Sequence, residues 1–181
     1  LMQPKDAREL AAMMKTALAH DGPVAIRYPR EPGPAVDLGP DIAPLPIGVA
    51  ETVVEPEGAG GSAVWLWALG DMLPLACETA GLLRAAGMRC GVVNARFIKP
   101  LDTARLWAQA RQGARFVTLE NGAVAGGFGA AVREALAAGG FDAPVRACGW
   151  PDEFVGQGTL QQLMQDHGLT PERLAKMVVS G

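Results

Sequence analysis

Hydrophobic residues within the first twenty positions recur at the three- and four-residue spacing of an amphipathic helix. The apolar positions of this stretch are Leu10, Met13, Met14, Ala17 and Leu18. Asp6 is placed to cap the start of the helix, and the run Asp21-Gly22-Pro23 ends it. The apolar residues that follow predict a short strand at 24–28.

From residue 47 onward, short apolar runs alternate with segments of helical periodicity. Strands are predicted at 47–54, 63–69, 89–94, 115–120 and 144–149. Helices are predicted at 72–86, 102–112, 127–138, 159–167 and 171–179. Such alternation favours an α/β fold, a three-layer α/β/α arrangement around a mostly parallel five-stranded sheet. The glycine-rich segment 58–61 is expected to be a hairpin turn between the first two strands.

A segment with little apolar periodicity separates the two regions. From Pro29 to Pro46 the chain carries six prolines and two glycines, a composition typical of linkers. We therefore expect residues 1–30 to belong to one domain, residues 31–46 to be a linker, and residues 47–181 to form a second domain.

Composition and charge exclude several classes of partner. The 181 residues are 49% hydrophobic, which is ample for a packed core, and the formal net charge is -3. Basic residues are scattered singly, so there is no basic stripe for nucleic acid. The longest apolar run, Ala63–Leu69, is far shorter than the roughly 20 residues of a membrane-spanning helix.

The three cysteines indicate a reducing compartment. Cys77, Cys90 and Cys148 are odd in number, far apart and set among apolar residues, which favours buried thiols over disulfides or a metal site. The N-terminal residues contain neither a basic leader nor an apolar signal core. We expect a cytoplasmic location.

The run Arg27-Tyr28-Pro29-Arg30 is the strongest candidate for an anion site. Arginine binds phosphate or carboxylate through a planar fork of donors that keeps its charge. Arg27 lies within the expected strand, where structural contacts are favoured, whereas Arg30 follows the rigid Pro29 and can extend toward a ligand.

A second basic pair, Arg96 and Lys99, lies between a strand and a helix. Asp102 is placed to cap that helix, and Pro100 stiffens the preceding turn. Arg96 and Lys99 could bind an anion at the carboxyl end of the sheet or form surface ion pairs. We favour the ion pairs.

A glycine-rich turn, Gly126-Gly127-Phe128-Gly129, follows Glu120-Asn121-Gly122. Backbone N–H groups at such a turn can bind phosphate, but the spacing matches neither a dinucleotide fingerprint nor a P-loop. Glu120 would also repel an anion. We favour tight turning and close helix packing, with Glu120 binding either a cation or backbone N–H groups.

The aromatic residues and histidines favour packing over chemistry. Trp65 and Trp67 share one face of a strand, Trp107 lies on a helix, and Trp150 begins a loop expected to pack against a neighbour. His20 and His167 lie near helix ends, without a nearby nucleophile or metal partner.

Together these motifs resemble the C-terminal end of the 1-deoxy-D-xylulose-5-phosphate synthase family over nearly the whole chain. The matching segments, in order, are Pro4-Lys5-Asp6, Asp21-Gly22-Pro23, Arg27-Tyr28-Pro29-Arg30, Pro46-Ile47-Gly48, Gly70, Asn94–Asp102, Thr118–Asn121, Gly126–Gly129, Gly149–Asp152 and Gln157-Gly158-Thr159. Related transketolases and the β subunits of 2-oxo-acid dehydrogenases share this final domain but generally lack the Arg-Tyr-Pro-Arg run.

The resemblance implies a homodimeric enzyme that uses thiamine diphosphate and magnesium. It decarboxylates pyruvate and joins the two-carbon fragment to glyceraldehyde 3-phosphate, for isoprenoid, thiamine and pyridoxal synthesis. Residues 1–30 would be the tail of the pyrimidine-binding domain, and residues 47–181 the transketolase C-terminal domain. The diphosphate and metal ligands and the activating glutamate would precede Leu1, so this chain would supply no catalytic, cofactor or metal ligand and would be inactive alone.

Arg30 is the one residue to which the resemblance assigns a role, binding the aldehyde's phosphate together with an upstream arginine. The family usually has glycine at the next position, whereas Glu31 stands here. Its carboxylate would weaken phosphate binding by about 0–1 kcal/mol if the pair is exposed. Asn121 replaces the second residue of an acidic pair, which we expect to affect an interface rather than chemistry.

Two alternatives remain open at this point. The chain could be chiefly a dimerisation and folding module, as the apolar strand Val64–Leu69 and the lack of a local catalytic set suggest. It could also be the final domain of a 2-oxo-acid dehydrogenase β subunit or of a split transketolase.

Overall fold

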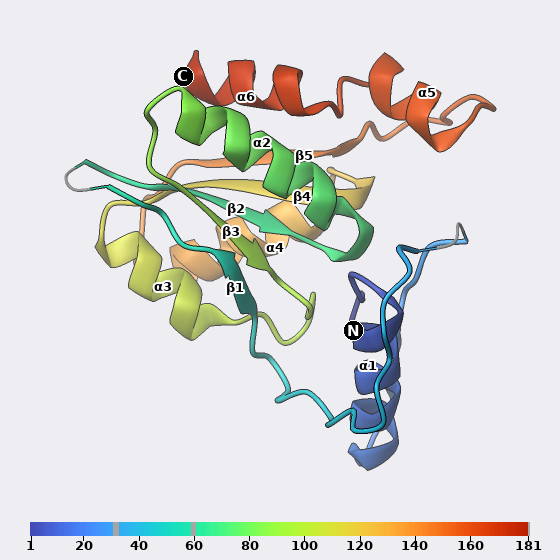
Figure 1. Cartoon of the computed structure of the whole chain (residues 1–181). Helices are drawn as coiled ribbons and strands as arrows, with labels where there is room; N and C mark the ends of the chain where they lie inside the picture. Colours follow the sequence, from blue (N-terminus) through green and yellow to red (C-terminus); the bar gives the residue numbers. More distant parts are fainter. Residues whose placement is uncertain (31–32, 59–60, 181) are drawn as a thin grey trace.

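The computed structural model describes residues 1–30, 33–58 and 61–180 (Figure 1). In this part of the chain, five strands form one sheet in the order β1-β3-β2-β4-β5. The strands are β1 (Glu51–Val54), β2 (Val64–Ala68), β3 (Cys90–Asn94), β4 (Arg115–Ala123) and β5 (Val145–Trp150). Only β1 runs antiparallel to its neighbour, and the α/β prediction is confirmed.

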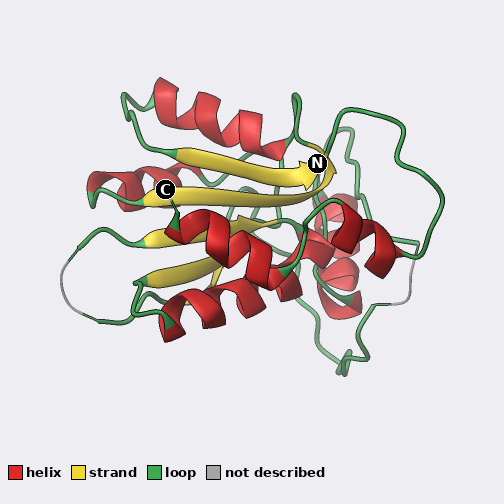
Figure 2. Ribbon diagram, turned by 90° about the horizontal axis from the view of Figure 1, so that it is seen from above, coloured by secondary structure: helices red, strands yellow, loops and turns green. Residues whose placement is uncertain are grey.

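Helices cover both faces of the sheet, as Figure 1 and the view from above in Figure 2 show. The helices of the C-terminal region are α2 (Leu73–Ala85), α3 (Thr103–Arg111), α4 (Phe128–Ala138), α5 (Leu160–Asp166) and α6 (Pro171–Val179). A short 3-10 turn, η1 (Gly70–Met72), precedes α2. Helices α2 and α6 share one hydrophobic cluster with the sheet, and α3 and α4 share the other. The chain therefore has the three predicted layers.

The alternation of side chains along β2 divides the core in two. Leu66 packs toward α2 and α6, whereas Trp65 and Trp67 pack toward α3 and α4. Trp67 is fully buried, and its Nε1 donates to Oε1 of Gln109 at 2.9 Å. Gly91 of β3 faces Trp65, where a Cβ atom would approach the indole to 2.6 Å. The predicted aromatic face is thus core.

The strongly apolar strand β2 is central in the sheet and buried along its whole length. Both of its faces are covered by helices, which explains its continuous hydrophobic run. The apolar side chains of this strand therefore belong to the core of the chain.

Two predictions about local pairing are also wrong. Residues 24–28 do not form a regular strand; Ile26 makes only an isolated parallel bridge to Met2. The expected hairpin between the first two strands of the C-terminal region is absent from the described residues, because β3 lies between β1 and β2. Of the glycine-rich segment 58–61, residues 59–60 lie outside the described residues.

Helix α1 (Ala7–Ala19) stands beside the sheet rather than on one of its faces (Figure 1). Its predicted cap is confirmed, since Oδ1 of Asp6 accepts from the backbone N of Glu9 at 2.8 Å. The residues before and after α1 meet in a small cluster built on Met2, Met13 and Phe97. This third cluster joins the N-terminal segment to the loop that follows β3.

Burial of the thiols agrees with the prediction for two cysteines. Cys90 and Cys148 are buried in the core, and desolvation raises the pKa of Cys90 to about 12 and that of Cys148 to about 11. Cys77 on α2 is only partly buried. Among the helices of the described ranges, none combines the length and hydrophobicity needed to cross a membrane.

Candidate functional site

Side chains from three parallel strands converge with the N-terminal segment at the carboxyl edge of the sheet. Asp71 follows β2, Asn121 lies near the end of β4, and Trp150 ends β5. Gln3 reaches the same edge from the segment before α1. In α/β proteins this edge is the usual place for ligands.

Hydrogen bonds join these residues into one chain. Nε2 of Gln3 donates to Oδ1 of Asp71 at 3.0 Å, and Nδ2 of Asn121 donates to Oδ2 of Asp71 at 2.5 Å. Nε1 of Trp150 donates to Oδ1 of Asn121 at 2.6 Å. The indole of Trp150 also meets the His167 ring edge-on, with 5.6 Å between ring centroids. The network ties three strands and the N-terminal segment together.

Arg27 attaches the Arg-Tyr-Pro-Arg run to this network. Its Nη2 donates to the backbone carbonyl of Asn121, and its backbone N donates to the carbonyl of Met2 at 2.9 Å. Gly122 leaves room for the guanidinium, since a Cβ atom there would lie 3.3 Å from Nη1 of Arg27. Arg27 therefore makes the structural contacts predicted for it.

Arg30 is exposed, three positions beyond Arg27. A cavity of about 280 Å³ lies beside this run, and its lining includes Tyr28, Pro29, Pro34, Asp71, Pro74 and Leu160. Glu31, the carboxylate expected to compete for Arg30, lies outside the described residues.

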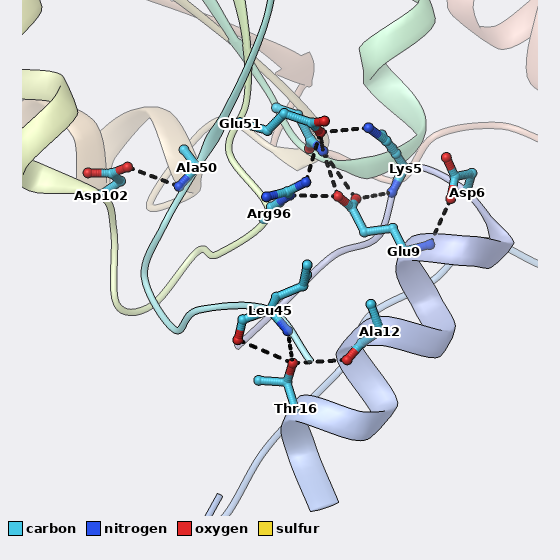
Figure 3. Close-up of polar contacts among 11 residues, drawn as sticks. Lys5, Asp6, Glu9, Ala12, Thr16, Leu45, Ala50, Glu51, Arg96 and Asp102 are labelled. Carbon is cyan, nitrogen blue, oxygen red and sulfur yellow. Dashed lines mark hydrogen bonds and ion pairs between the residues drawn. The ribbon is translucent and has the colours of Figure 1, made fainter. Parts of the chain in front are cut away.

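The second basic candidate, Arg96, forms ion pairs with two carboxylates (Figure 3). Its Nε lies 2.7 Å from Oε1 of Glu9 and its Nη2 lies 3.0 Å from Oε2 of Glu51. Lys5 also pairs with Glu51, at 2.6 Å, and Nδ2 of Asn94 donates to Oε1 of Glu9 at 2.9 Å. The ion-pair interpretation is thus confirmed for Arg96, although the pair with Glu9 is largely buried instead of lying at the surface. Lys99, by contrast, is exposed.

Opposing effects act on the pKa of Glu51 in this cluster. Burial of the carboxylate raises the pKa, but hydrogen bonds from Lys5 and Asn94 and the charge of Arg96 lower it by more. The net result is a pKa below the ordinary value. Lys5 and Arg96 are thus paired with carboxylates of the same chain.

Asp102 binds the segment before β1 as well as capping α3. Its Oδ1 accepts from the backbone N of Arg105 at 3.0 Å, which confirms the predicted cap. Its Oδ2 accepts from the backbone N of Ala50 at 2.9 Å, directly before β1 (Figure 3).

The glycine-rich turn before α4 is filled by a side chain of this protein. Oε2 of Glu120 accepts from the backbone N of Phe128 at 2.6 Å, and Oε1 accepts from the backbone N of Gly129 at 2.9 Å. A Cβ atom at Gly127 would overlap the Glu120 carboxylate, and one at Gly129 would lie 2.5 Å from Cβ of Ala147. The packing interpretation is confirmed, and this turn does not fit a diphosphate, because a carboxylate already occupies its N–H groups.

Sequence reasoning missed Gln3, Asp71 and Glu9. For Asp71 the sequence contained one signal: a polar residue that follows Gly70 shortly after a strongly apolar strand. Gly70 itself has a φ of 53°, and a Cβ atom there would lie 2.5 Å from Cγ of Gln3. Gln3 and Glu9 had no such signal, because their partners are far away in sequence.

Comparison with known proteins places this geometry in a family. The family described as Transketolase, C-terminal domain, matches residues 53–174. The chain belongs to this family.

The relatives agree with the resemblance expected from the sequence motifs. The 1-deoxy-D-xylulose-5-phosphate synthase of Heliobacterium modesticaldum is 44% identical over 177 residues, which is 98% of this chain and 27% of the relative. The synthase of Desulforudis audaxviator is 42% identical over 181 residues, covering 99% of this chain and 28% of the relative. The chain therefore spans about a quarter of the length of these curated relatives.

A solved structure described as a split-gene transketolase, inactive β4 tetramer, superposes with a TM-score of 0.86. It is 35% identical, and the match covers 99% of this chain and 56% of that chain. The sheet and helices described above therefore match the transketolase C-terminal domain fold.

Proposed function

We propose that this chain forms the C-terminal part of a thiamine diphosphate-dependent 1-deoxy-D-xylulose-5-phosphate synthase. The whole enzyme condenses pyruvate with glyceraldehyde 3-phosphate, releases carbon dioxide, and supplies isoprenoid, thiamine and pyridoxal synthesis. The observation that carries the proposal is the 44% identity to a synthase across 98% of the chain, including the region of the Arg-Tyr-Pro-Arg run.

In this proposal the chain comprises three parts. Residues 1–30 are the tail of the pyrimidine-binding domain, residues 31–46 are the linker, and residues 47–181 are the transketolase C-terminal domain. One observation supports this division: the family match begins at residue 53, after the N-terminal segment and the linker.

Arg30 is proposed to bind the phosphate of the aldehyde substrate. Its guanidinium suits a phosphate through bidentate hydrogen bonds. Three features support the assignment: Arg30 is exposed, the run beside it lines a cavity at the carboxyl edge of the sheet, and Arg27 anchors that run to β4.

Thiamine diphosphate and magnesium are proposed to be held by the preceding cofactor-binding and pyrimidine-binding portions of the enzyme, within a homodimer. The glycine-rich turn of this chain would not contribute, since Glu120 occupies it. No step of the reaction is therefore assigned to residues 31–181.

The test is an assay of the complete gene product that carries this chain, with pyruvate and glyceraldehyde 3-phosphate as substrates. We expect carbon dioxide and the sugar phosphate in equal amounts, and no product from the 181-residue chain alone. Arg30→Ala should raise the KM for the aldehyde about tenfold or more and change the KM for pyruvate little. Equal effects on both substrates would reject the role of Arg30.

A split transketolase is the second candidate, and the TM-score of 0.86 with such a protein favours it. The two candidates differ in the donor. A complete protein that ignores pyruvate and transfers a two-carbon unit from a ketose phosphate would be a transketolase, and the synthase proposal would fall.

A further inference from the structure

Asn121 is bonded in three directions at the point where the Arg-Tyr-Pro-Arg run meets the sheet. Its side-chain amide donates to Asp71 and accepts from Trp150, and its carbonyl accepts from Arg27. These contacts come from the turn after β2, the end of β5, and the N-terminal segment. The position of Asn121 is therefore set by tertiary partners.

We propose that Asn121 is a positioning residue for Arg30. By holding its own carbonyl in place, Asn121 anchors the guanidinium of Arg27, and Pro29 then restricts the backbone between Arg27 and Arg30. The inference rests on the proposed function, because it takes the phosphate of the aldehyde as the ligand of Arg30. Asn121 itself touches no reacting atom.

The two side-chain partners require an amide at position 121. The carboxylate of Asp71 offers only acceptor oxygens, and the indole of Trp150 offers only a donor. An amide satisfies both at once, because it carries one donor group and one acceptor. A carboxylate at position 121 would accept from Trp150 but would face the Asp71 carboxylate across a 2.5 Å contact.

The same set of hydrogen bonds can also form when the Asp and Asn side chains at positions 71 and 121 are exchanged. With Asn at position 71 and Asp at position 121, the amide of residue 71 donates to residue 121 and its oxygen accepts from Gln3. Asp71→Asn alone is tolerated for a further reason: Oε1 of the buried Gln3 has no hydrogen-bond partner among the described residues, so rotation of the Gln3 amide can present an acceptor.

The experiment uses the complete enzyme and compares glyceraldehyde 3-phosphate with unphosphorylated glyceraldehyde. Asn121→Asp should lower kcat/KM about tenfold for the phosphorylated aldehyde and less than about twofold for the other, so discrimination between them falls. Asp71→Asn should reduce discrimination less than Asn121→Asp does, because an amide at position 71 can still pair with both Gln3 and Asn121. The double variant Asp71→Asn/Asn121→Asp should restore discrimination to within about threefold of the parent enzyme.

Two further variants separate positioning from general loss of stability. Arg27→Ala removes the anchored group itself and should reduce discrimination as Asn121→Asp does. Trp107→Phe is the matched control, since it removes a hydrogen bond from Nε1 to the Ala135 carbonyl, 2.8 Å long, which joins α3 to α4 outside the Asn121 network. It should lower the unfolding temperature without changing discrimination.

The outcomes distinguish this inference from the proposed function. Equal losses with both aldehydes, or no rescue in the double variant, would overturn the positioning role. If Asn121→Asp fails to fold, Arg27→Ala and the double variant decide: normal discrimination in Arg27→Ala would overturn it. If Arg30→Ala leaves discrimination unchanged, the phosphate-binding role of Arg30 is rejected, independently of the results for the Asn121 variants.

Discussion

Arg96 and Glu9 form an ion pair with 2.7 Å between Nε and Oε1, although 87 positions separate them in the chain. The Glu9 side chain is only 3% exposed, and Arg96 places a positive charge beside its buried carboxylate. The pair connects the start of α1 to the loop after β3, and thereby the N-terminal segment to the C-terminal region.

Arg96→Leu should destabilise the protein by about 3 kcal/mol, because it leaves a buried carboxylate without its charged partner. Urea unfolding followed by far-UV circular dichroism measures the change. Lys5→Met is the matched control: Lys5 and Glu51 are partly exposed, and their pair should contribute only about 0–1 kcal/mol. Similar losses in the two variants would contradict this ranking.

Gly127→Ala should destabilise the protein by about 1–3 kcal/mol, the range for inserting a methyl group into a packed site. The new methyl would displace the Glu120 carboxylate from the start of α4. Gly156→Ala is the control, because nothing lies within 4 Å of its Cβ position and its φ is not in the left-handed region. Thermal unfolding of both variants tests the difference, and an unchanged unfolding temperature for Gly127→Ala would refute the packing role.

The contribution of Glu51 to stability should depend on pH. Its folded-state pKa lies below the ordinary value of 4.5, so its ionised form stabilises the fold above that value and the contribution is lost as pH falls through the folded pKa. The gap in unfolding free energy between the parent protein and Glu51→Gln should therefore be constant near neutral pH and shrink below pH 4.5. A gap that persists unchanged to pH 3 would contradict the ion-pair network.

Native-state thiol labelling should modify Cys77 first. Cys90 and Cys148 are buried, and desolvation holds their pKa values at about 12 and about 11, so little thiolate forms near pH 8. Mass spectrometry after brief maleimide treatment should show one added label, with all three positions modified in denaturant. Cys77→Ser should remove the native label, and modification of Cys90 in the folded protein would argue against the described core.

Predictions that depended on neighbouring residues were confirmed. Asp6 and Asp102 cap their helices because a cap bonds to backbone three residues ahead. Trp65 and Trp67 share a core face because side chains alternate along a strand. The turn at Gly127 was correctly interpreted as packing, although the partner of Glu120 was left open between a cation and backbone N–H groups; the structure shows the N–H groups.

Predictions that depended on distant partners were incomplete or wrong. The prediction of a hairpin between β1 and β2 was wrong because β3, from later in the chain, pairs with both strands. Arg96 was correctly favoured for ion pairs, but Glu9 was not identified as its partner. The link from Arg27 to Asn121 spans 94 positions and has no local signature.

The sequence by itself determined the α/β class, the helices and strands of the C-terminal region, the caps at Asp6 and Asp102, and the family resemblance carried by motifs in order. These features arise from local periodicity, backbone preferences and residue types. Only the tertiary structure decided the strand order, the burial of Arg96 beside Glu9, and the network that holds Arg27 at Asn121. The physical reason is that hydrogen bonds and ion pairs between distant segments form only where the packing of the sheet brings those segments together. The spacing of residues along the chain does not predict which segments will be neighbours.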